Sequence, residues 1–285
     1  MKISIITINW NNAVGLEKTI KSVIEQTYHN IEYIVIDGGS KDNSVEIIKK
    51  YNDHISYWLS ESDNGIYNAM NKGAAVATGE YCLFLNSGDK LIEREIIKKI
   101  IESNTFCKNI VSCDLLVCKD YKLIYKNAPK DDFTSIDFII RNPIPHPSTF
   151  IKTELIKEYP YDEDLKIASD FVFFFKMLIL KRVTYQRIPV ALSFFYKDGI
   201  SSKNGNIIGQ REGYDCLVKY VDSQILDEFK GKNQPERLII LRTAMLLSRR
   251  TYKILLLTSK FLLKSQKLLA RIKNCYYTKK YKGKY

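Results

Sequence analysis

The chain has 285 residues, of which 45% are hydrophobic and 27% are charged, so the composition is that of a globular protein and excludes a disordered or fibrous one. It contains 44 basic and 32 acidic residues, yet residues 237–285 hold 14 of the basic residues and no acidic residue. The positive net charge is therefore confined to the C-terminal end, while residues 1–236 are close to neutral.

The cysteine spacing and the hydropathy pattern indicate in which cellular compartment the protein works. The six cysteines show no paired CxxC spacing, which indicates reduced thiols rather than a disulfide or zinc framework. No uncharged apolar run is long enough to span a membrane, and the N-terminus has neither the apolar core nor the cleavage site of a secretory signal. We therefore expect a cytoplasmic protein.

Strand and helix patterns alternate over the first 90 residues. Apolar, β-branched runs predict four strands, at residues 3–8, 31–37, 55–61 and 80–86. Apolar residues at helical spacing predict helices between them, around 16–24, 45–48 and 64–77. This alternation predicts an α/β fold with a Rossmann-like, mostly parallel sheet flanked by helices.

The pattern is less regular after residue 90. A helix is expected at about 91–103 and another at 169–180, with a proline-containing loop at 127–147. Strands are expected at 109–118, 121–126, 148–151 and 183–195, and helices in the last 50 residues. We expect one domain at 1–205 and a helical, basic C-terminal extension at 206–285.

Oxygen-bearing side chains stand at the carboxyl ends of all four of the first strands, at Asn9, Asp37, Glu61 with Asp63, and Asn86 with Asp89. Any one of them is more often a turn or helix-cap residue, but ligands of such sheets bind beyond the carboxyl ends of the strands. Asp37 could accept hydrogen bonds from a pyrimidine or a ribose, and Asp89 could hold a divalent metal on a diphosphate. The four positions together predict a nucleotide-sugar site.

The chain resembles the family 2 glycosyltransferases, which have the GT-A nucleotide-diphospho-sugar transferase fold. The resemblance covers roughly residues 2–180 and is carried by ISIITINWNN, QTYHNIEYIVIDGGSKDNS, SESDNGIYNAMNKGAAVATGEYCLFLNSGD, HPSTFIK and ASDFVFFFKM. It implies inverting transfer of a sugar from a nucleotide-diphospho-sugar, UDP-linked, to a hydroxyl of a saccharide or lipid-linked acceptor in surface polysaccharide biosynthesis.

The resemblance also implies roles for single residues. Asp170 matches the catalytic base, and the LNSGD segment, with Asn86 and Asp89, matches the motif that binds Mg²⁺ or Mn²⁺ beside the donor. Asp37 matches the residue that recognises uracil. The other matches to donor-binding positions are Thr7, Asn9, Asp63, Asn71, Lys72 and Gly73.

The chain departs from the family pattern at three places. Gly38 stands where a second aspartate is common, Ser169 stands where glutamate is usual, and Asn86 and Gly88 replace aspartates of the metal motif. These departures leave open a non-catalytic sugar-nucleotide-binding or scaffold protein. A nucleotidyltransferase is disfavoured because the loop after the first strand, NWNNAVG, is not a glycine-rich basic loop.

Two of the matched residues have a second interpretation. Asp170 stands at the expected start of a helix, where it could be a cap rather than a base. His146, in the segment PIPHPS, could be a structural residue or could face the acceptor or the diphosphate.

The basic end of the chain predicts an amphipathic helix at 249–271, with a basic stripe opposite an apolar face. Such a helix could pack on the domain, or bind nucleic acid or an anionic membrane surface. No nucleic-acid recognition fold accompanies the charge. We therefore favour peripheral docking at the inner face of the cell membrane, where anionic lipid attracts each nearby cation. The sequence makes no prediction of the oligomeric state.

Overall fold

The apolar run at the N-terminus forms β1 (Ile3–Asn9), whose seven residues are all buried. The computed structural model describes residues 1–119, 122–130, 139, 143–196 and 205–220. In it β1 pairs in parallel with β2 (Ile31–Asp37) on one side and with β4 (Tyr81–Phe84) on the other. β3 (Tyr57–Ser60) adds to β2, also in parallel. The four parallel strands predicted from the first 90 residues are confirmed.

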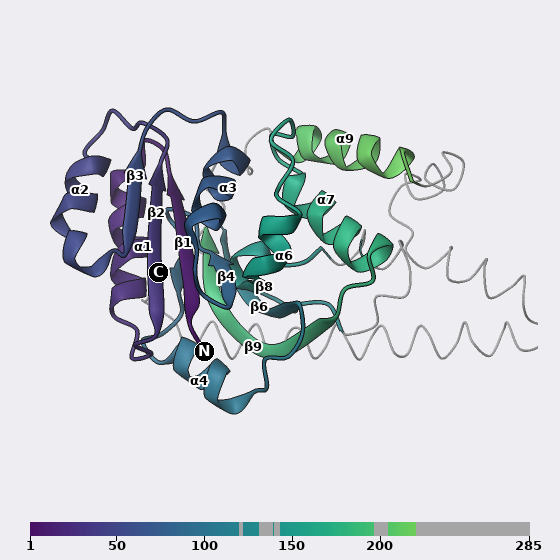
Figure 1. The fold of residues 1–285 in the computed structure, drawn as a ribbon, viewed down its shortest axis with the longest axis horizontal. Coiled ribbons are helices and arrows are strands. Elements are labelled where there is room, and N and C mark those ends of the chain that lie inside the picture. Colours follow the sequence, from purple (N-terminus) through teal and green to yellow (C-terminus); the bar gives the residue numbers. More distant parts are fainter. Residues whose placement is uncertain (120–121, 131–138, 140–142, 197–204, 221–285) are drawn as a thin grey trace, which may run out of the picture. The chain divides into compact units, whose positions relative to one another are not determined.

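Helices cover both faces of this parallel part (Figure 1). α1 (Ala13–Ile24) and α2 (Ser44–Lys50) pack against each other, and α3 (Ile66–Val76) packs on β1 and β2. The approach of α3 is close, because a Cβ added at Gly73 would lie 2.5 Å from Cγ2 of Ile6. Gly73 is therefore a packing residue between helix and sheet.

The second half of the sheet is mixed in direction. β8 (Thr149–Lys152) pairs antiparallel with β4 and with β6 (Ile110–Lys119), and β9 (Tyr185–Tyr196) runs parallel to β6. β5 (Lys90–Leu91) lies antiparallel to β9, and β7 (Lys122–Lys126) pairs antiparallel with β6. The strand order is β3-β2-β1-β4-β8-β6-β9-β5. The fold class is confirmed as α/β, with a mixed sheet.

The remaining described helices are α4 (Ile96–Ser103), α6 (Thr153–Glu158), α7 (Ser169–Phe175) and α9 (Gly205–Val218), with 3-10 turns at Asn52–His54 and His146–Ser148. α7 continues into a π-helical turn, Lys176–Leu180. The helix expected at 91–103 begins only at Ile96, because Lys90–Leu91 is drawn into the sheet as β5.

A buried ion pair lies where β6 is irregular. Asp114 is fully buried at a register shift between β6 and β9, and Arg187 of β9 donates to it at 2.9 Å. The same carboxylate accepts hydrogen bonds from the Tyr125 hydroxyl and, at 2.7 Å, from the backbone N–H of Ala128. The pair therefore joins β6, β7 and β9.

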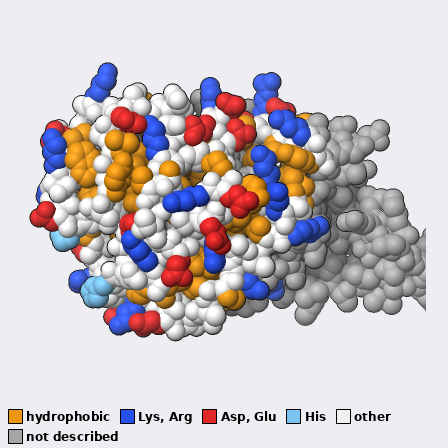
Figure 2. All heavy atoms as spheres, viewed as in Figure 1, with side chains coloured by type: hydrophobic (Ala, Val, Ile, Leu, Met, Phe, Trp, Pro, Cys, Tyr) orange, Lys and Arg blue, Asp and Glu red, His pale blue; other side chains and the backbone are white. Residues whose placement is uncertain are grey.

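Residues 1–216 form one compact unit. On the face seen in Figure 2, Lys and Arg side chains are interspersed with Asp and Glu over the described part of the chain. Cys82, Cys107, Cys113, Cys118 and Cys216 are free thiols. None of the helices within the described residues is both long and apolar enough to cross a membrane. Cys275 and the helix predicted at 249–271 lie outside the described residues, and the boundary between 205 and 206 stays a prediction.

Candidate functional site

The carboxyl ends of three parallel strands form one polar row. The register aligns Asn9 of β1 with Asp37 of β2, and Asp37 with Ser60 of β3. Nδ2 of Asn9 donates to Oδ1 of Asp37 at 2.8 Å, and the Ser60 hydroxyl donates to Oδ2 at 2.7 Å. Ser40, from the turn after β2, donates to Oδ1 through its hydroxyl at 2.6 Å and to Oδ2 through its backbone N–H at 2.9 Å.

Asp37 is fully buried, and its carboxylate accepts these four hydrogen bonds. Burial by itself would raise the pKa of Asp37, but the bonds donated by Ser40, Ser60 and Asn9 outweigh burial and lower it. A carboxylate has about four acceptor positions. Asp37 is therefore an ionised anchor that orders the edge of the sheet.

Asp63 joins this edge from the loop between β3 and α3. A Cβ built at Gly38 would lie 2.4 Å from Oδ2 of Asp63, so the Asp63 carboxylate rests directly against the Gly38 backbone. Its Oδ1 accepts from the backbone N–H of Gly65 at 2.9 Å. The structure thus brings together Asn9, Asp37 and Asp63, as the sequence predicts, and it shows why position 38 is a glycine.

The segment LNSGD forms a turn after β4 that meets the same edge. The backbone N–H of Ser87 donates to the carbonyl of Ile8 at 3.0 Å, and that of Asp89 donates to the carbonyl of Asn86 at 2.9 Å. Gly88 has φ +103°, a conformation that side-chain-bearing residues rarely adopt. A glycine at position 88 therefore follows from the turn itself. Asp89 is 5% exposed.

Two amide oxygens at this edge are buried without a hydrogen-bond partner within the described part of the chain: Oδ1 of Asn9 and Oδ1 of Asn86. A buried acceptor left unpaired costs about 1–3 kcal/mol, so each requires an explanation. Asn9 is the last residue of β1 and Asn86 lies two residues after β4, and these two strands are neighbours in the sheet. Unpaired acceptors at adjacent strand ends are what a ligand-binding edge would provide.

The donor atoms near Asp89 suit a hard divalent cation. The Asp89 carboxylate and the unpaired Oδ1 of Asn86 are oxygen ligands, which Mg²⁺ and Mn²⁺ prefer. Among the described residues no group of three His, Cys, Asp or Glu side chains could hold a metal ion. The residues fit a site that would take its remaining ligands from phosphate and water.

Three predicted donor-binding residues have other partners. Thr7 is fully buried, and its hydroxyl donates to the carbonyl of Leu85 at 2.8 Å. The Asn71 amide donates to the carbonyl of Tyr161 at 2.9 Å and accepts from its N–H at 2.9 Å. Lys72 forms an ion pair with Glu61 at 2.7 Å. Asn71 thus holds the segment that leads to α7, and Thr7 lies beneath the polar row.

Asp170 lies in the first turn of α7 and is half-buried. Its Oδ1 accepts from the backbone N–H of Phe171 at 2.8 Å and from the Tyr67 hydroxyl at 3.2 Å. The one proton of that hydroxyl is shared with the carbonyl oxygen of Ile167, which is the nearer acceptor at 2.6 Å. Burial, and after it the charge of Asp170, raise the pKa of Tyr67, which keeps the hydroxyl protonated. Within the described residues no hydrogen bond reaches Oδ2, the second carboxylate oxygen of Asp170.

His146 lies in a buried cluster of aromatic rings, among Phe84, Tyr161 and Phe174. It is 7% exposed, and its ring stacks on that of Phe84 with centroids 5.3 Å apart. Its Nε2 is 2.8 Å from the Tyr161 hydroxyl. Burial lowers the pKa of His146 more than the charge of Asp170 raises it, so the ring is held neutral. These contacts are those of a packing residue.

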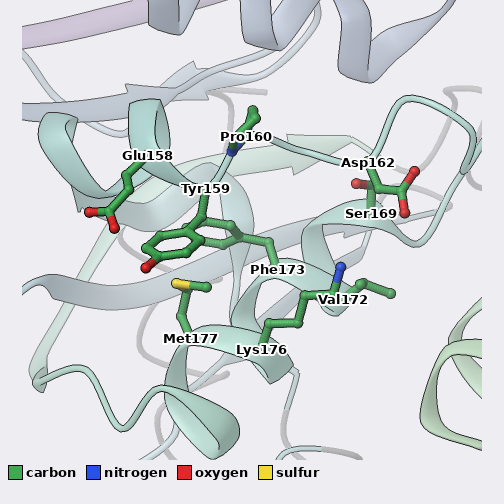
Figure 3. A pocket seen from close by; sticks show the side chains of 9 residues that line it. All are labelled: Glu158, Tyr159, Pro160, Asp162, Ser169, Val172, Phe173, Lys176 and Met177. Atoms are coloured by element: carbon green, nitrogen blue, oxygen red, sulfur yellow. The ribbon is translucent and has the colours of Figure 1, made fainter. Parts of the chain in front are cut away.

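A half-open pocket of about 220 Å³ lies along another face of α7 (Figure 3). It is lined by Glu158, Tyr159, Pro160, Asp162, Ser169, Val172, Phe173, Lys176 and Met177. Ser169, which stands where the family usually has glutamate, is 1% exposed, and its hydroxyl is unpaired within the described residues. The residues predicted to bind the donor or to act as base do not line this pocket.

Sequence reasoning missed several residues of the site. Ser40 could have been found, because it lies three residues after Asp37, and Ser60 could have been found, because it stands beside Glu61 at the end of a predicted strand. Tyr67 could not have been found, because it lies 103 positions before Asp170.

The sequence is similar to a known family of proteins. The model of the family described as "Glycosyl transferase family 2" matches residues 4–178. An uncharacterized glycosyltransferase of Mycobacterium tuberculosis is 34% identical over 210 residues, which cover 70% of this chain and 77% of that protein.

Two solved structures are similar in fold. TarS residues 1–349 of S. aureus, in complex with UDP, has a TM-score of 0.58 at 19% identity and covers 78% of this chain and 67% of its own. The mannosyltransferase PcManGT of Pyrobaculum calidifontis, in complex with GDP-Man and Mn²⁺, has a TM-score of 0.60 at 14% identity, with 96% and 87% covered. Because the family model covers more than half of the sequence, the chain belongs to glycosyltransferase family 2 and is a glycosyltransferase with the GT-A fold.

Proposed function

We propose that the chain transfers a sugar from a nucleotide-diphospho-sugar to an acceptor hydroxyl, with inversion at the anomeric carbon. The observation that carries this proposal is the state of Asp170. One oxygen of its carboxylate is held by Tyr67 and by a backbone N–H, while no hydrogen bond from the described residues reaches the other. Oδ2 would take the proton of the acceptor hydroxyl as that oxygen attacks the anomeric carbon.

The donor would lie along the row at the strand ends. Oδ1 of Asn9 has no partner among the described residues and would accept a hydrogen bond from the base or the ribose. Asp37 would govern donor affinity by holding Asn9 and Ser40 in place, and Asp63 would add a second carboxylate beside them. A UDP-linked donor is supported by the family resemblance and by the UDP complex of TarS, and a GDP-linked donor is the alternative that a binding screen would distinguish.

A divalent cation would be held by Asp89, with Asn86 beside it, and would offset the charge that develops on the leaving diphosphate. Support comes from the oxygen ligands at this turn and from the Mn²⁺ complex of the structural neighbour PcManGT. The acceptor would be a saccharide or a lipid-linked saccharide of a surface polysaccharide.

The test of the base is Asp170→Asn, which keeps an oxygen that can cap the helix but removes the basic group. We expect sugar transfer to fall by about 10²-fold or more, while calorimetry of UDP or of the UDP-sugar gives an unchanged Kd. Asp164→Asn is the matched control, because Asp164 is an exposed acid of the segment just before α7. Transfer at the wild-type rate by Asp170→Asn would show that Asp170 is a helix cap.

A further inference from the structure

α9 carries an acidic residue that is bonded to the segment just before Asp170. Oε1 of Glu212 accepts from the backbone N–H of Lys166 at 2.8 Å. Oε2 accepts from the N–H of Ile167 at 2.9 Å and from that of Ala168 at 3.0 Å. One side chain thus satisfies three consecutive backbone donors, and bonds to a charged acceptor are stronger than neutral ones.

The residue that precedes α7 has no side chain that could accept a hydrogen bond. Ala168 is the residue that precedes α7, and its side chain has no oxygen with which to cap the helix. Caps are ordinarily supplied by Ser, Thr, Asp or Asn at this position. Glu212, 44 residues further along the chain than Ala168, accepts from the N–H of Ala168 and of the two residues before it, so it holds the chain that leads into α7.

α9 also packs closely on the same segment. A Cβ added at Gly209 would lie 2.9 Å from Cγ2 of Ile167, and one added at Gly213 would lie 3.4 Å from the ring of Phe171. Both glycines lie within one turn of Glu212 on the helix. Residues on either side of Asp170 are therefore contacted by α9.

Ile167 connects Glu212 to the carboxylate. Its N–H donates to Glu212, while its carbonyl oxygen accepts from the Tyr67 hydroxyl at 2.6 Å. That hydroxyl is also 3.2 Å from Oδ1 of Asp170. The Ile167 carbonyl shares a peptide unit with the N–H of Ala168, which donates to Glu212 at 3.0 Å, so a shift of that unit would disturb the hydroxyl beside the carboxylate.

We propose that Glu212 is a positioning residue for Asp170, acting through the backbone of residues 166–168 and through Tyr67. The inference rests on the proposed role of Asp170 as the base. It makes one residue of α9, Glu212, a support of the proposed base. Displacement of a reacting group by about 1 Å can cost about 10²-fold in rate, so loss of Glu212 has a kinetic consequence.

The experiment compares full-length Glu212→Ala and Glu212→Gln with Asp215→Ala. Asp215 is an exposed acid on the same helix whose ion pair is with Arg211, 3.8 Å away, so it is a matched control. We expect Glu212→Ala to lower kcat for transfer by about 10- to 100-fold and to leave the UDP Kd and the donor KM unchanged. Glu212→Gln keeps one oxygen that can accept from Ile167 and Ala168, so its kcat lies between those of wild type and Glu212→Ala. Asp215→Ala behaves as wild type.

A double variant separates positioning from general stability. If Glu212 acts through Asp170, adding Glu212→Ala to Asp170→Asn lowers kcat little further, because residues that act as a unit are not additive. Fully additive losses, or a wild-type kcat in both Glu212 variants, would overturn the inference and leave the base assignment standing. A wild-type rate in Asp170→Asn alone would overturn the base, and this inference with it. Glu212→Gln decides the matter if Glu212→Ala does not fold.

Discussion

Single residues at the strand ends divide into those that hold the site and those that would contact ligands. Asp37 is buried and fully hydrogen-bonded, so its carboxylate organises Asn9, Ser40 and Ser60. Asn9 and Asn86 instead each have a buried amide oxygen that no group in the described part of the chain pairs with. An acid that looks like a ligand contact in the sequence can thus be the support of its neighbour, because only the fold shows which lone pairs are already used.

We expect the metal dependence of sugar transfer to require Asp89. Asn suits a turn as well as Asp does, so Asp89→Asn keeps the fold but removes the charged oxygen ligand. We expect metal-stimulated transfer to collapse in Asp89→Asn and the Tm to stay near that of wild type. In the wild type, EDTA should abolish transfer and Mn²⁺ should restore it.

The control for Asp89→Asn is Asp53→Asn. Asp53 is an exposed acid in the 3-10 turn Asn52–His54. It should retain metal-stimulated transfer. Full wild-type activity in EDTA would contradict a metal at Asp89 and would leave the LNSGD segment as a turn that closes β4.

Among the secondary-structure elements, the parallel and the mixed half of the sheet differ in what they contribute. The parallel half, β3-β2-β1-β4, delivers the polar row at its carboxyl edge, while the mixed half is joined by β6 and β9. The Asp114–Arg187 pair lies at the irregularity between β6 and β9, where Asp114 is fully buried and the Arg187 side chain is 15% exposed. Removing one partner would leave a buried charge uncompensated.

The substitution Arg187→Met tests how much the Asp114–Arg187 ion pair contributes to stability. It keeps much of the apolar stem of arginine but leaves Asp114 without its cation, and breaking a buried pair in this way costs about 3–5 kcal/mol. The measurement is the free energy of unfolding in urea. Lys99→Met is the control: Lys99 is 53% exposed and pairs with Glu93 at 3.1 Å, so its loss should cost about 0–1 kcal/mol. Equal losses of unfolding free energy in the two variants would show that the buried pair stabilises the fold no more than the exposed pair does.

For the whole molecule, the distribution of charge is the dominant feature. Residues 237–285 contain 14 basic residues and no acidic residue, whereas the proposed base Asp170 and its positioning residue Glu212 both lie before position 213. We propose that this region is a helical, basic extension that docks peripherally on the inner face of the cell membrane, where a lipid-linked acceptor would be met. Apolar burial and attraction to anionic lipid would both contribute, and salt would screen the second.

Deleting residues 249–285 tests this proposal. The deletion should release the protein from anionic vesicles in flotation assays and leave hydrolysis of a soluble donor largely intact. Raising the ionic strength should weaken vesicle binding by the full-length chain. Vesicles of neutral lipid are the control. Failure of the full-length chain to bind anionic vesicles at low salt, or unfolding of the truncated protein, would contradict membrane docking.

The sequence by itself determined the fold class, the four parallel strands and the polar residues at their ends, because apolar periodicity and strand-helix alternation are local properties. The family resemblance added Asp170 and LNSGD, and the family model bears out the family. The start of the helix expected from 91 was misplaced, because pairing of Lys90–Leu91 with β9 is a contact distant in sequence.

Only the tertiary structure decided how the predicted residues divide the work. It shows that Asp63 fills the space beside Gly38, that Asn71 binds Tyr161, and that His146 is enclosed by aromatic rings. It also connects Asp170 to Tyr67, and Ile167 to Glu212, across separations of 103 and 45 residues. Such contacts depend on hydrogen-bond geometry and packing between elements distant in the chain, which no local pattern of residues encodes.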